Sequence, residues 1–194
     1  YILLMVKPLK IIQVSNPGSG STVLVNLLMA YFQPYEGVVF MGRNYYNEDI
    51  IHNNIVIKTH DKKINEWIDK YNEDFDLYFI ISNRNDYDWG EFHNYKNILF
   101  IEYDVLLETE NNSIQNISKV VYEKVENFLP KEYIIHNRKK ISIQNGINRI
   151  NNMNKRYDEI KNKPFEFVDK YYQIHGSHRN KNHEESKKIR SLRK

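Results

Sequence analysis

The sequence predicts an α/β fold, with a mainly parallel central sheet of about five strands, flanking helices and a helical C-terminal part. Short runs rich in Ile, Val, Leu and Phe recur along the first half of the chain, and most do not alternate with polar residues. Such runs are typical of parallel strands that are covered on both faces. Helical patterns separate the runs, so right-handed crossovers are expected between strands. Residues 1–194 are predicted to form a single domain that ends, at about residues 179–194, in a basic and partly disordered tail.

Each element is predicted from the length and period of its apolar residues. Strands are expected at residues 10–15, 38–41, 55–59, 77–82 and 98–102. Helices are expected at residues 21–32, 62–72 and 113–128. Residues 131–173 are predicted to be mostly helical, with tyrosines and phenylalanines as anchors.

The turn after the first strand is the most informative segment of the chain. Residues 16–22 read N-P-G-S-G-S-T and lead directly into a predicted helix. Such a loop can wrap its backbone N–H groups around an anion, and the positive end of the helix dipole favours negative charge there. Gly18 and Gly20 permit positive φ and close approach of the backbone. The loop also carries the hydroxyl donors Ser19, Ser21 and Thr22.

The predicted ligand of this loop is a phosphate or sulfate group. The loop is not a Walker A sequence, because no lysine lies between Ser15 and Phe32, and it also lacks the G-x-G-x-x-G pattern. The alternative interpretation is a turn that only joins a strand to a helix.

Polar side chains also follow the later strands. Lys58 and His60 end the third predicted strand, Arg84 follows the fourth, and Tyr103 follows the fifth. Because the carboxyl ends of parallel strands meet at one edge of a sheet, we expect these side chains beside the loop. The alternatives are that Lys58 and His60 only cap the edge of the sheet, and that Tyr103 belongs to the core.

With these segments in order, the chain resembles the sulfotransferases that use 3'-phosphoadenosine 5'-phosphosulfate (PAPS). Their phosphosulfate loop, P-K-S-G-T-T, corresponds to P-G-S-G-S-T at residues 17–22. Their K-T-H is matched at residues 58–60, and their R-x-P-x-D in part at residues 84–88. Their Y-E-D-L, followed by a helix that ends in F-L-G, is similar to residues 103–106 and 128–130. The resemblance covers about residues 10–130 and implies a P-loop NTPase-like fold.

The resemblance implies that a sulfuryl group passes from PAPS to an acceptor hydroxyl, with 3'-phosphoadenosine 5'-phosphate (PAP) as product and no metal. Lys58 would neutralise charge on the bridging oxygen, and His60 would take the proton of the acceptor. Arg84 would bind the 3'-phosphate, and Tyr103 would approach the adenine. The residues implied in donor binding are Pro17, Gly18, Ser19, Gly20, Ser21, Thr22, Arg84, Tyr103, Gly176, Ser177, His178 and Arg179. The last four residues are also consistent with the start of the basic tail.

Three positions depart from the pattern of this family. Gly18 replaces the lysine of the loop, Asp86 replaces the proline of R-x-P, and Phe92 stands where a serine follows the arginine. Lys58 is expected to stand in for the lost loop lysine. Two other functions stay open: a P-loop nucleotide kinase or phosphotransferase, and a catalytically degenerate module that binds a nucleotide or a glycan.

Composition narrows the class of partner. The net charge of +3 does not indicate a nucleic-acid partner, and no apolar run has the length of a membrane helix. The absence of Cys excludes thiolate nucleophiles and Cys-ligated zinc, and it favours a reducing compartment such as the cytoplasm. The expected acceptor is a small molecule or a carbohydrate, and the sequence does not indicate an oligomeric state. Trp67 is expected to anchor its helix, whereas Trp89 is expected to lie near a ligand.

Overall fold

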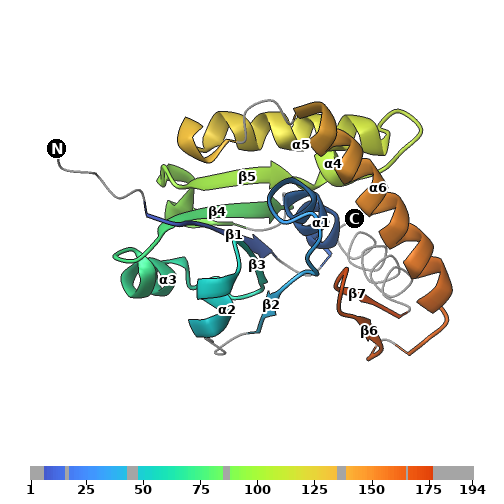
Figure 1. The fold of residues 1–194 in the computed structure, drawn as a ribbon, viewed down its shortest axis with the longest axis horizontal. Coiled ribbons are helices and arrows are strands. Elements are labelled where there is room, and N and C mark those ends of the chain that lie inside the picture. Colours follow the sequence, from blue (N-terminus) through green and yellow to red (C-terminus); the bar gives the residue numbers. More distant parts are fainter. Residues whose placement is uncertain are drawn as a thin grey trace, which may run out of the picture.

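The centre of the molecule is a five-stranded sheet in which every strand pair is parallel (Figure 1). The computed structural model describes residues 7–15, 18–42, 48–84, 88–134, 139–164 and 166–176, with the backbone alone at residues 139–141. The strands of the sheet, in the order β2-β3-β1-β4-β5, are β1 (Leu9–Ser15), β2 (Phe40–Met41), β3 (Val56–Thr59), β4 (Asp76–Asn83) and β5 (Ile98–Glu102). The predicted α/β class is confirmed.

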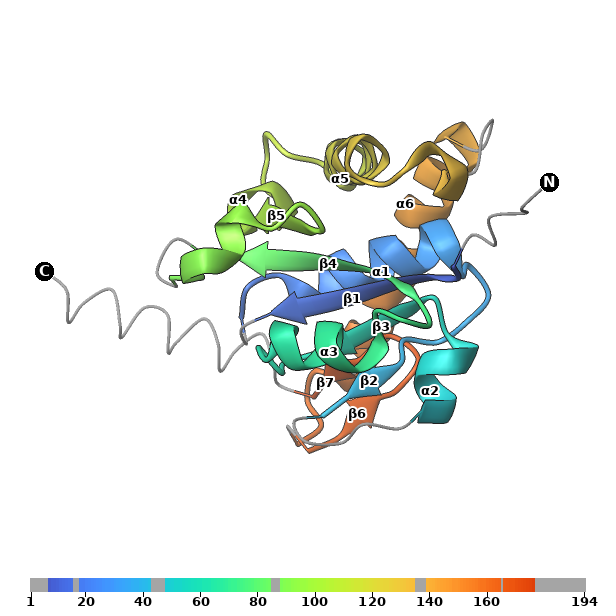
Figure 2. The same cartoon turned by 90° about the vertical axis from the view of Figure 1, so that its left-hand side faces the viewer.

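Helices cover both faces of this sheet (Figures 1 and 2). Three long helices lie over one face, namely α1 (Ser21–Phe32), α5 (Ile114–Phe128) and α6 (Lys139–Ile160). The other face is covered by α2 (Glu48–Asn53) and α3 (Ile64–Tyr71). The shorter elements are α4 (Tyr103–Leu106) and the 3-10 helices η1 (Gly90–Asn94) and η2 (Lys131–Tyr133). In the described part of the chain, no helix combines the length and the apolar character needed to cross a membrane.

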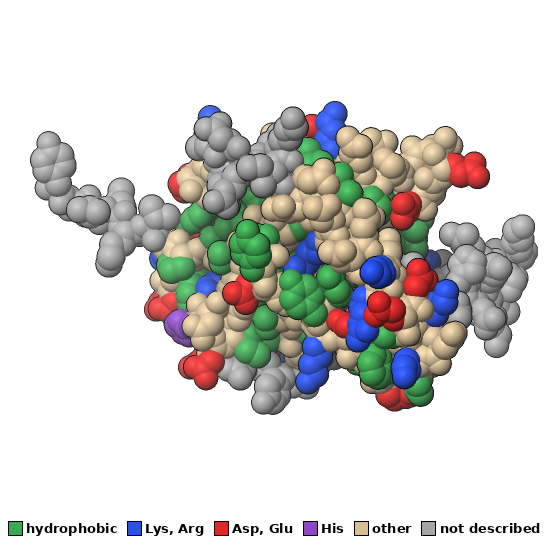
Figure 3. Space-filling view, turned by 45° about the vertical axis from the view of Figure 1, so that its right-hand side comes forward, with side chains coloured by type: hydrophobic (Ala, Val, Ile, Leu, Met, Phe, Trp, Pro, Cys, Tyr) green, Lys and Arg blue, Asp and Glu red, His purple; other side chains and the backbone are tan. Residues whose placement is uncertain are grey.

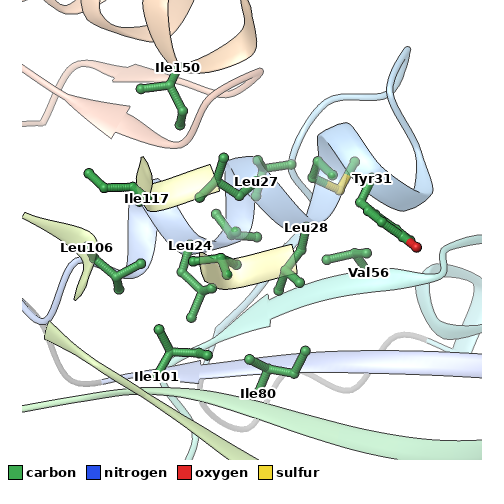
Figure 4. Packing of buried hydrophobic residues seen from close by; sticks show 14 of the residues in the cluster. Leu24, Leu27, Leu28, Tyr31, Val56, Ile80, Ile101, Leu106, Ile117 and Ile150 are labelled. Atoms are coloured by element: carbon green, nitrogen blue, oxygen red, sulfur yellow. The ribbon is translucent and has the colours of Figure 1, made fainter. Parts of the chain in front are cut away.

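Helix α1 is enclosed on nearly all sides, because it lies between the sheet and the pair α5 and α6. Every residue from Leu24 to Tyr31 is buried. Figure 4 shows Leu24 and Leu28 directed toward Ile80 and Ile101 of the sheet, while Ile117 and Ile150 approach α1 from the opposite side. A helix without a polar face is stable only when both sides are covered. This packing fixes the position of α1, and with it the position of the loop that precedes it.

The register of the strands aligns their carboxyl ends at one edge. Ser15 of β1 pairs with Ser82 of β4, and Val14 pairs with Thr59 of β3. The arrowheads of β1 and β4 in Figure 2 point to the same edge. Loops that leave these strands therefore gather at that edge, which is where open parallel sheets bind ligands.

The prediction of a mostly helical segment at residues 131–173 is wrong in its last part. Helix α6 ends at Ile160, and a two-stranded antiparallel sheet follows, formed by β6 (Val168–Asp169) and β7 (Ile174–His175). Pro164 disfavours helical geometry at the residue before it and has no N–H to donate. The hairpin returns to the body of the molecule, where the N–H of Val38 donates to the carbonyl oxygen of Tyr171 (2.9 Å). Residue 38 lies outside β2, so the second strand is shorter than the predicted 38–41.

Candidate anion-binding site

In the described part of the loop between β1 and α1, the two glycines have the positive φ that glycine permits. Gly18 and Gly20 both lie in the left-handed region, with φ of 77° and 76°. A Cβ atom at Gly20 would come within 3.0 Å of the Leu106 Cβ atom and 3.3 Å of Tyr103 Cδ2. Glycine is therefore required at residue 20 both by the backbone conformation and by its neighbours.

The N-terminus of α1 carries no negative charge of its own. Gly20 is the residue that precedes the helix, the described residues give it no side-chain cap, and the first turn contains no acidic residue. Uncapped N–H groups and the positive end of the dipole make such a terminus attractive to an anion. A helix terminus of this kind does not by itself indicate a binding site, so the side chains beside it decide.

A buried lysine lies against this first turn. Lys58 is only 4% exposed, and its Nζ atom donates to Thr22 Oγ1 at 3.3 Å. Burial lowers the pKa of Lys58 to about 8 from an ordinary value of 10.5. Within the described ranges Lys58 forms no ion pair with a carboxylate. The ammonium group and the positive end of α1 have the same sign, so together they favour an anion between them.

His60 lies beside the end of β1. Its Nδ1 atom is 2.9 Å from the carbonyl oxygen of Ser15 and 3.3 Å from Ser15 Oγ. A carbonyl oxygen can only accept, so this contact places a proton on Nδ1, and in the neutral ring the lone pair is then on Nε2. The edge of the Phe40 ring packs on the imidazole, with ring centres 5.3 Å apart. The ring is thus oriented as a proton acceptor through Nε2.

Arg84 and Tyr103 lie beside the loop as well, toward β4 and β5. Arg84 Nη1 donates to the carbonyl oxygen of Gly18 (3.2 Å), and its guanidinium carbon lies 5.2 Å from the centre of the Tyr103 ring. Both side chains are partly exposed. The structure therefore brings side chains from three strand ends to the loop that follows a fourth strand, β1. Lys58 and His60 come from the side of β3, and Arg84 and Tyr103 from the side of β4 and β5.

Not every predicted loop hydroxyl faces outward. Ser19 is fully buried, and its hydroxyl is 2.8 Å from the Ser82 hydroxyl of β4. Ser21 is also buried, whereas Gly18, Gly20 and Thr22 keep exposed surface. In this conformation the Ser19 hydroxyl anchors the loop to β4 of the sheet. The loop residues that a ligand can reach are the partly exposed Gly18, Gly20 and Thr22.

Two residues that orient His60 and Ser19, namely Ser15 and Ser82, were not predicted from the sequence. Ser15 ends β1, Ser82 is the next-to-last residue of β4, and the two are partners in the register of these strands. A small polar residue at the end of two apolar runs is the signal that could have pointed to them.

The remaining predicted residues are only partly described. Pro17, Ser177, His178 and Arg179 lie outside the described residues. Gly176 belongs to the end of the hairpin, where its N–H donates to the carbonyl oxygen of Phe167 at 2.9 Å. A Cβ atom at Gly176 would meet the carbonyl oxygens of Lys163 and Pro164, so close backbone packing explains this glycine.

Trp89 is a core residue, and the expectation that it lies near a ligand is wrong. It is 3% exposed, it packs with the residues beneath α3, and its Nε1 donates to Asn83 Oδ1 (3.0 Å). An apolar ring with one satisfied donor is the usual form of a buried tryptophan. Trp67, which is 1% exposed, anchors α3 as predicted. Phe92 also packs against this part of the core.

No protein-family model, no curated protein and no solved structure matches the chain. Among the residues that the structure describes, no group of three or more His, Asp or Glu side chains is placed to hold a metal ion. The candidate site therefore stands on its own geometry: an uncapped helix N-terminus, a buried ammonium, a guanidinium and an oriented imidazole around one glycine-containing loop.

Proposed function

We propose that the chain binds PAPS at the loop of residues 17–22 and transfers its sulfuryl group to an acceptor hydroxyl. The observation that carries this proposal is the buried Lys58 at the uncapped start of α1. A buried cation beside a positive helix end is costly unless an anion joins them. A phosphosulfate is such an anion. The cysteine-free chain fits a reducing compartment such as the cytoplasm.

Lys58 and His60 have the chemistry that the transfer requires. The acceptor oxygen attacks sulfur, the bond between sulfur and the bridging oxygen breaks, and PAP leaves with that oxygen on its 5'-phosphate. Lys58 stabilises the negative charge that grows on the bridging oxygen. His60 takes the proton of the acceptor hydroxyl on Nε2, since Nδ1 donates to Ser15. Sulfuryl transfer of this kind depends mainly on positioning and on charge stabilisation, as phosphoryl transfer does.

Arg84 and Tyr103 supply the part of the site that we assign to the adenosine 3'-phosphate. A guanidinium offers a planar pair of donors to a phosphate, and its contact with Tyr103 orders the side chain. Pro17 and the segment 176–179 are proposed to complete the site for the nucleotide.

A second candidate is a binding module that has lost catalysis. Two observations favour it: Gly18 stands where the resembled family has its loop lysine, and Ser19 is fully buried. In this case the chain would bind the nucleotide without transferring sulfate.

Calorimetric titration with PAP, adenosine 5'-monophosphate and ATP with Mg²⁺ tests which nucleotide the site prefers, and so tests the proposed identity of the donor. We expect PAP to bind most tightly, and tighter binding of ATP with Mg²⁺ would overturn the assignment in favour of a phosphotransferase. Lys58→Met should abolish PAP binding. Lys10→Met is the matched control, because Lys10 is also a buried lysine of the sheet but donates to the carbonyl oxygens of His52 and Asn54. It should leave PAP binding unchanged.

Transfer of labelled sulfate from PAPS to mixed hydroxyl acceptors then separates enzyme from binding module. The enzyme predicts transfer that falls by about 10²–10⁴-fold in His60→Gln while PAP affinity is kept. Tight PAP binding without transfer to any acceptor would support the binding module instead.

A further inference from the structure

A polar pocket lies away from the loop, at the other end of α1. It has a volume of about 160 Å³ and opens between the chain that follows α1, helix α6 and the hairpin turn. Its lining includes Tyr35, Tyr171 and Tyr172. Figure 3, in which the side of the molecule that carries α6 comes forward, shows uncharged polar surface and separate apolar patches, with charged side chains of both signs among them. We call this cavity the α6 pocket.

Among the described residues that line the α6 pocket, Arg149 is the one with a cationic side chain. It is 6% exposed, its Nε donates to Asn26 Oδ1 (2.9 Å), and its Nη1 donates to the Tyr171 hydroxyl (3.4 Å). The guanidinium carbon lies 4.9 Å from the ring centre of Tyr171 and 5.6 Å from that of Tyr172. Its Nη2 atom is buried and has no hydrogen-bond partner in the described part of the chain.

A buried guanidinium with an unused donor is a position for an acceptor. Leaving such a donor unsatisfied is unfavourable, and more so for a charged group. The arginine keeps its charge, because guanidinium groups are not deprotonated in proteins. A carboxylate that accepts from Nη2 would satisfy the donor and neutralise the charge together.

The rest of the lining suits a hydroxyl-rich molecule. Asn145, Asn148 and Asn152 recur on one face of α6, and all three line the pocket. Each amide both donates and accepts, as a hydroxyl group does. Tyr35, which is 93% exposed, and Tyr171, which is 42% exposed, offer flat apolar faces at the rim. One cation, several amides and flat aromatic faces describe a site for a singly charged sugar.

We propose that the α6 pocket binds one sugar residue that carries a carboxylate, that is, a uronic acid. The carboxylate accepts from Arg149 Nη2, the hydroxyls pair with the asparagines, and a face of the ring packs on a tyrosine. Because Nη2 is buried, the proposal requires a neighbouring side chain to shift and admit the carboxylate, and the partly exposed Tyr171 ring against the guanidinium is the one that we propose to move. The volume is below the range of sites for larger ligands and suits a single ring. The proposal does not depend on sulfate transfer.

Nuclear magnetic resonance of the labelled chain tests this pocket. Glucuronate, glucose and acetate are added separately, and the side-chain signals of Arg149 and of the three asparagines are followed. We expect saturable shifts with glucuronate, at concentrations where glucose and acetate give little change. Equal binding of glucose would overturn the role of the carboxylate. Equal binding of acetate would mean an adventitious anion only, and shifts with none of the three would also overturn the proposal.

Two matched substitutions on α6 keep the test independent of folding. Asn148→Asp keeps the side-chain shape and the acceptor for Gln144, but it places a negative charge in the pocket. It should weaken glucuronate binding by about tenfold. Asn151→Asp adds the same charge to the same helix, outside the lining, and should leave binding unchanged. Equal effects of the two variants would overturn the site, while PAP binding by Asn148→Asp reports separately on the donor site.

Discussion

The ammonium group of Lys58 is 3.3 Å from the hydroxyl of Thr22, and this contact joins the end of β3 to the first turn of α1. Both the lysine and the helix N-terminus contribute positive charge, and burial removes the water that would screen it. The unliganded protein therefore carries an electrostatic cost at the place where we propose that the donor binds. Sites of this kind commonly exchange stability for function.

The first prediction concerns stability. Lys58→Met removes the buried charge and keeps the length of the side chain, so we expect the variant to exceed the wild type by about 1–3 kcal/mol in free energy of unfolding at pH 7. The pKa of Lys58 is about 8 in the folded state, below its ordinary 10.5, so the unfolded chain binds more protons between these values. The cost of burial is thus complete below pH 8 and fades as the pH rises toward 10.5.

Urea unfolding of both proteins at pH 7, 9 and 10 measures this difference, which should narrow with rising pH. Lys63→Met is the control, because Lys63 is exposed and pairs with Glu66 at 2.9 Å, and it should change little. A difference that stays constant with pH would contradict the assignment of the cost to the charge of Lys58.

The second prediction concerns the pH dependence of donor binding. An anion beside Lys58 favours the charged form of the lysine, so PAP should raise the pKa of Lys58 above about 8. Binding near pH 8.5 should then take up protons, and affinity should fall at higher pH. Calorimetry in buffers of different ionisation enthalpy measures the uptake. Binding without proton exchange at this pH would place the anion away from Lys58.

The third prediction concerns the loop backbone. Gly20→Ala should lower the free energy of unfolding by about 1–3 kcal/mol, because the residue has positive φ and its new Cβ would meet Leu106 at 3.0 Å. Gly90→Ala isolates the backbone strain, since Gly90 has a φ of 52° but open space around it. Gly42→Ala has neither feature and should be nearly neutral. Thermal unfolding of the three variants should follow this order, and an effect of Gly20→Ala no larger than that of Gly42→Ala would contradict it.

The fourth prediction concerns selectivity for the 3'-phosphate. Arg84→Met should lower the preference for PAP over adenosine 5'-monophosphate by about tenfold, because a charge-assisted pair is lost. Arg84 also holds the carbonyl oxygen of Gly18, so both nucleotides should bind more weakly. Arg156→Met is the control, because Arg156 pairs with Glu159 of α6 and Asp169 of β6, away from the loop. An equal loss for both nucleotides would assign Arg84 to the loop alone.

Much of the fold could be predicted because its signals are local. The predicted helix at residues 21–32 coincides with α1, and the predicted strand at 98–102 coincides with β5. Both are bounded by a clear change from apolar to polar residues or by glycine. The strands β6 and β7 have two residues each, which is too few to show the alternation of apolar and polar residues that predicts a strand. They are formed by pairing across a turn, in which Gln173 has a φ of 54°.

In the candidate site, too, the features with local sequence signals could be predicted, and those that depend on tertiary packing could not. That Lys58 and Arg84 lie beside the loop followed from parallel strand ends. The inward turn of the Ser19 hydroxyl did not, because its partner Ser82 is distant in sequence and is brought near only by the register of the sheet. Burial of Trp89 depends likewise on packing with β4 and the residues around it.

Helix α1 has no solvent-facing stripe between Leu24 and Tyr31, and this sets how the chain can vary. A substitution on an ordinary surface helix finds water on one side, whereas here each added or lost methyl group meets the sheet or the covering helices. In a saturation library scored for folding, tolerance to substitution should therefore be low at all eight of these positions. It should not rise and fall with the helical turn, as it does on a helix with one exposed face. Variation that alters ligand choice is left to the two ends of the helix, where the loop and the α6 pocket begin.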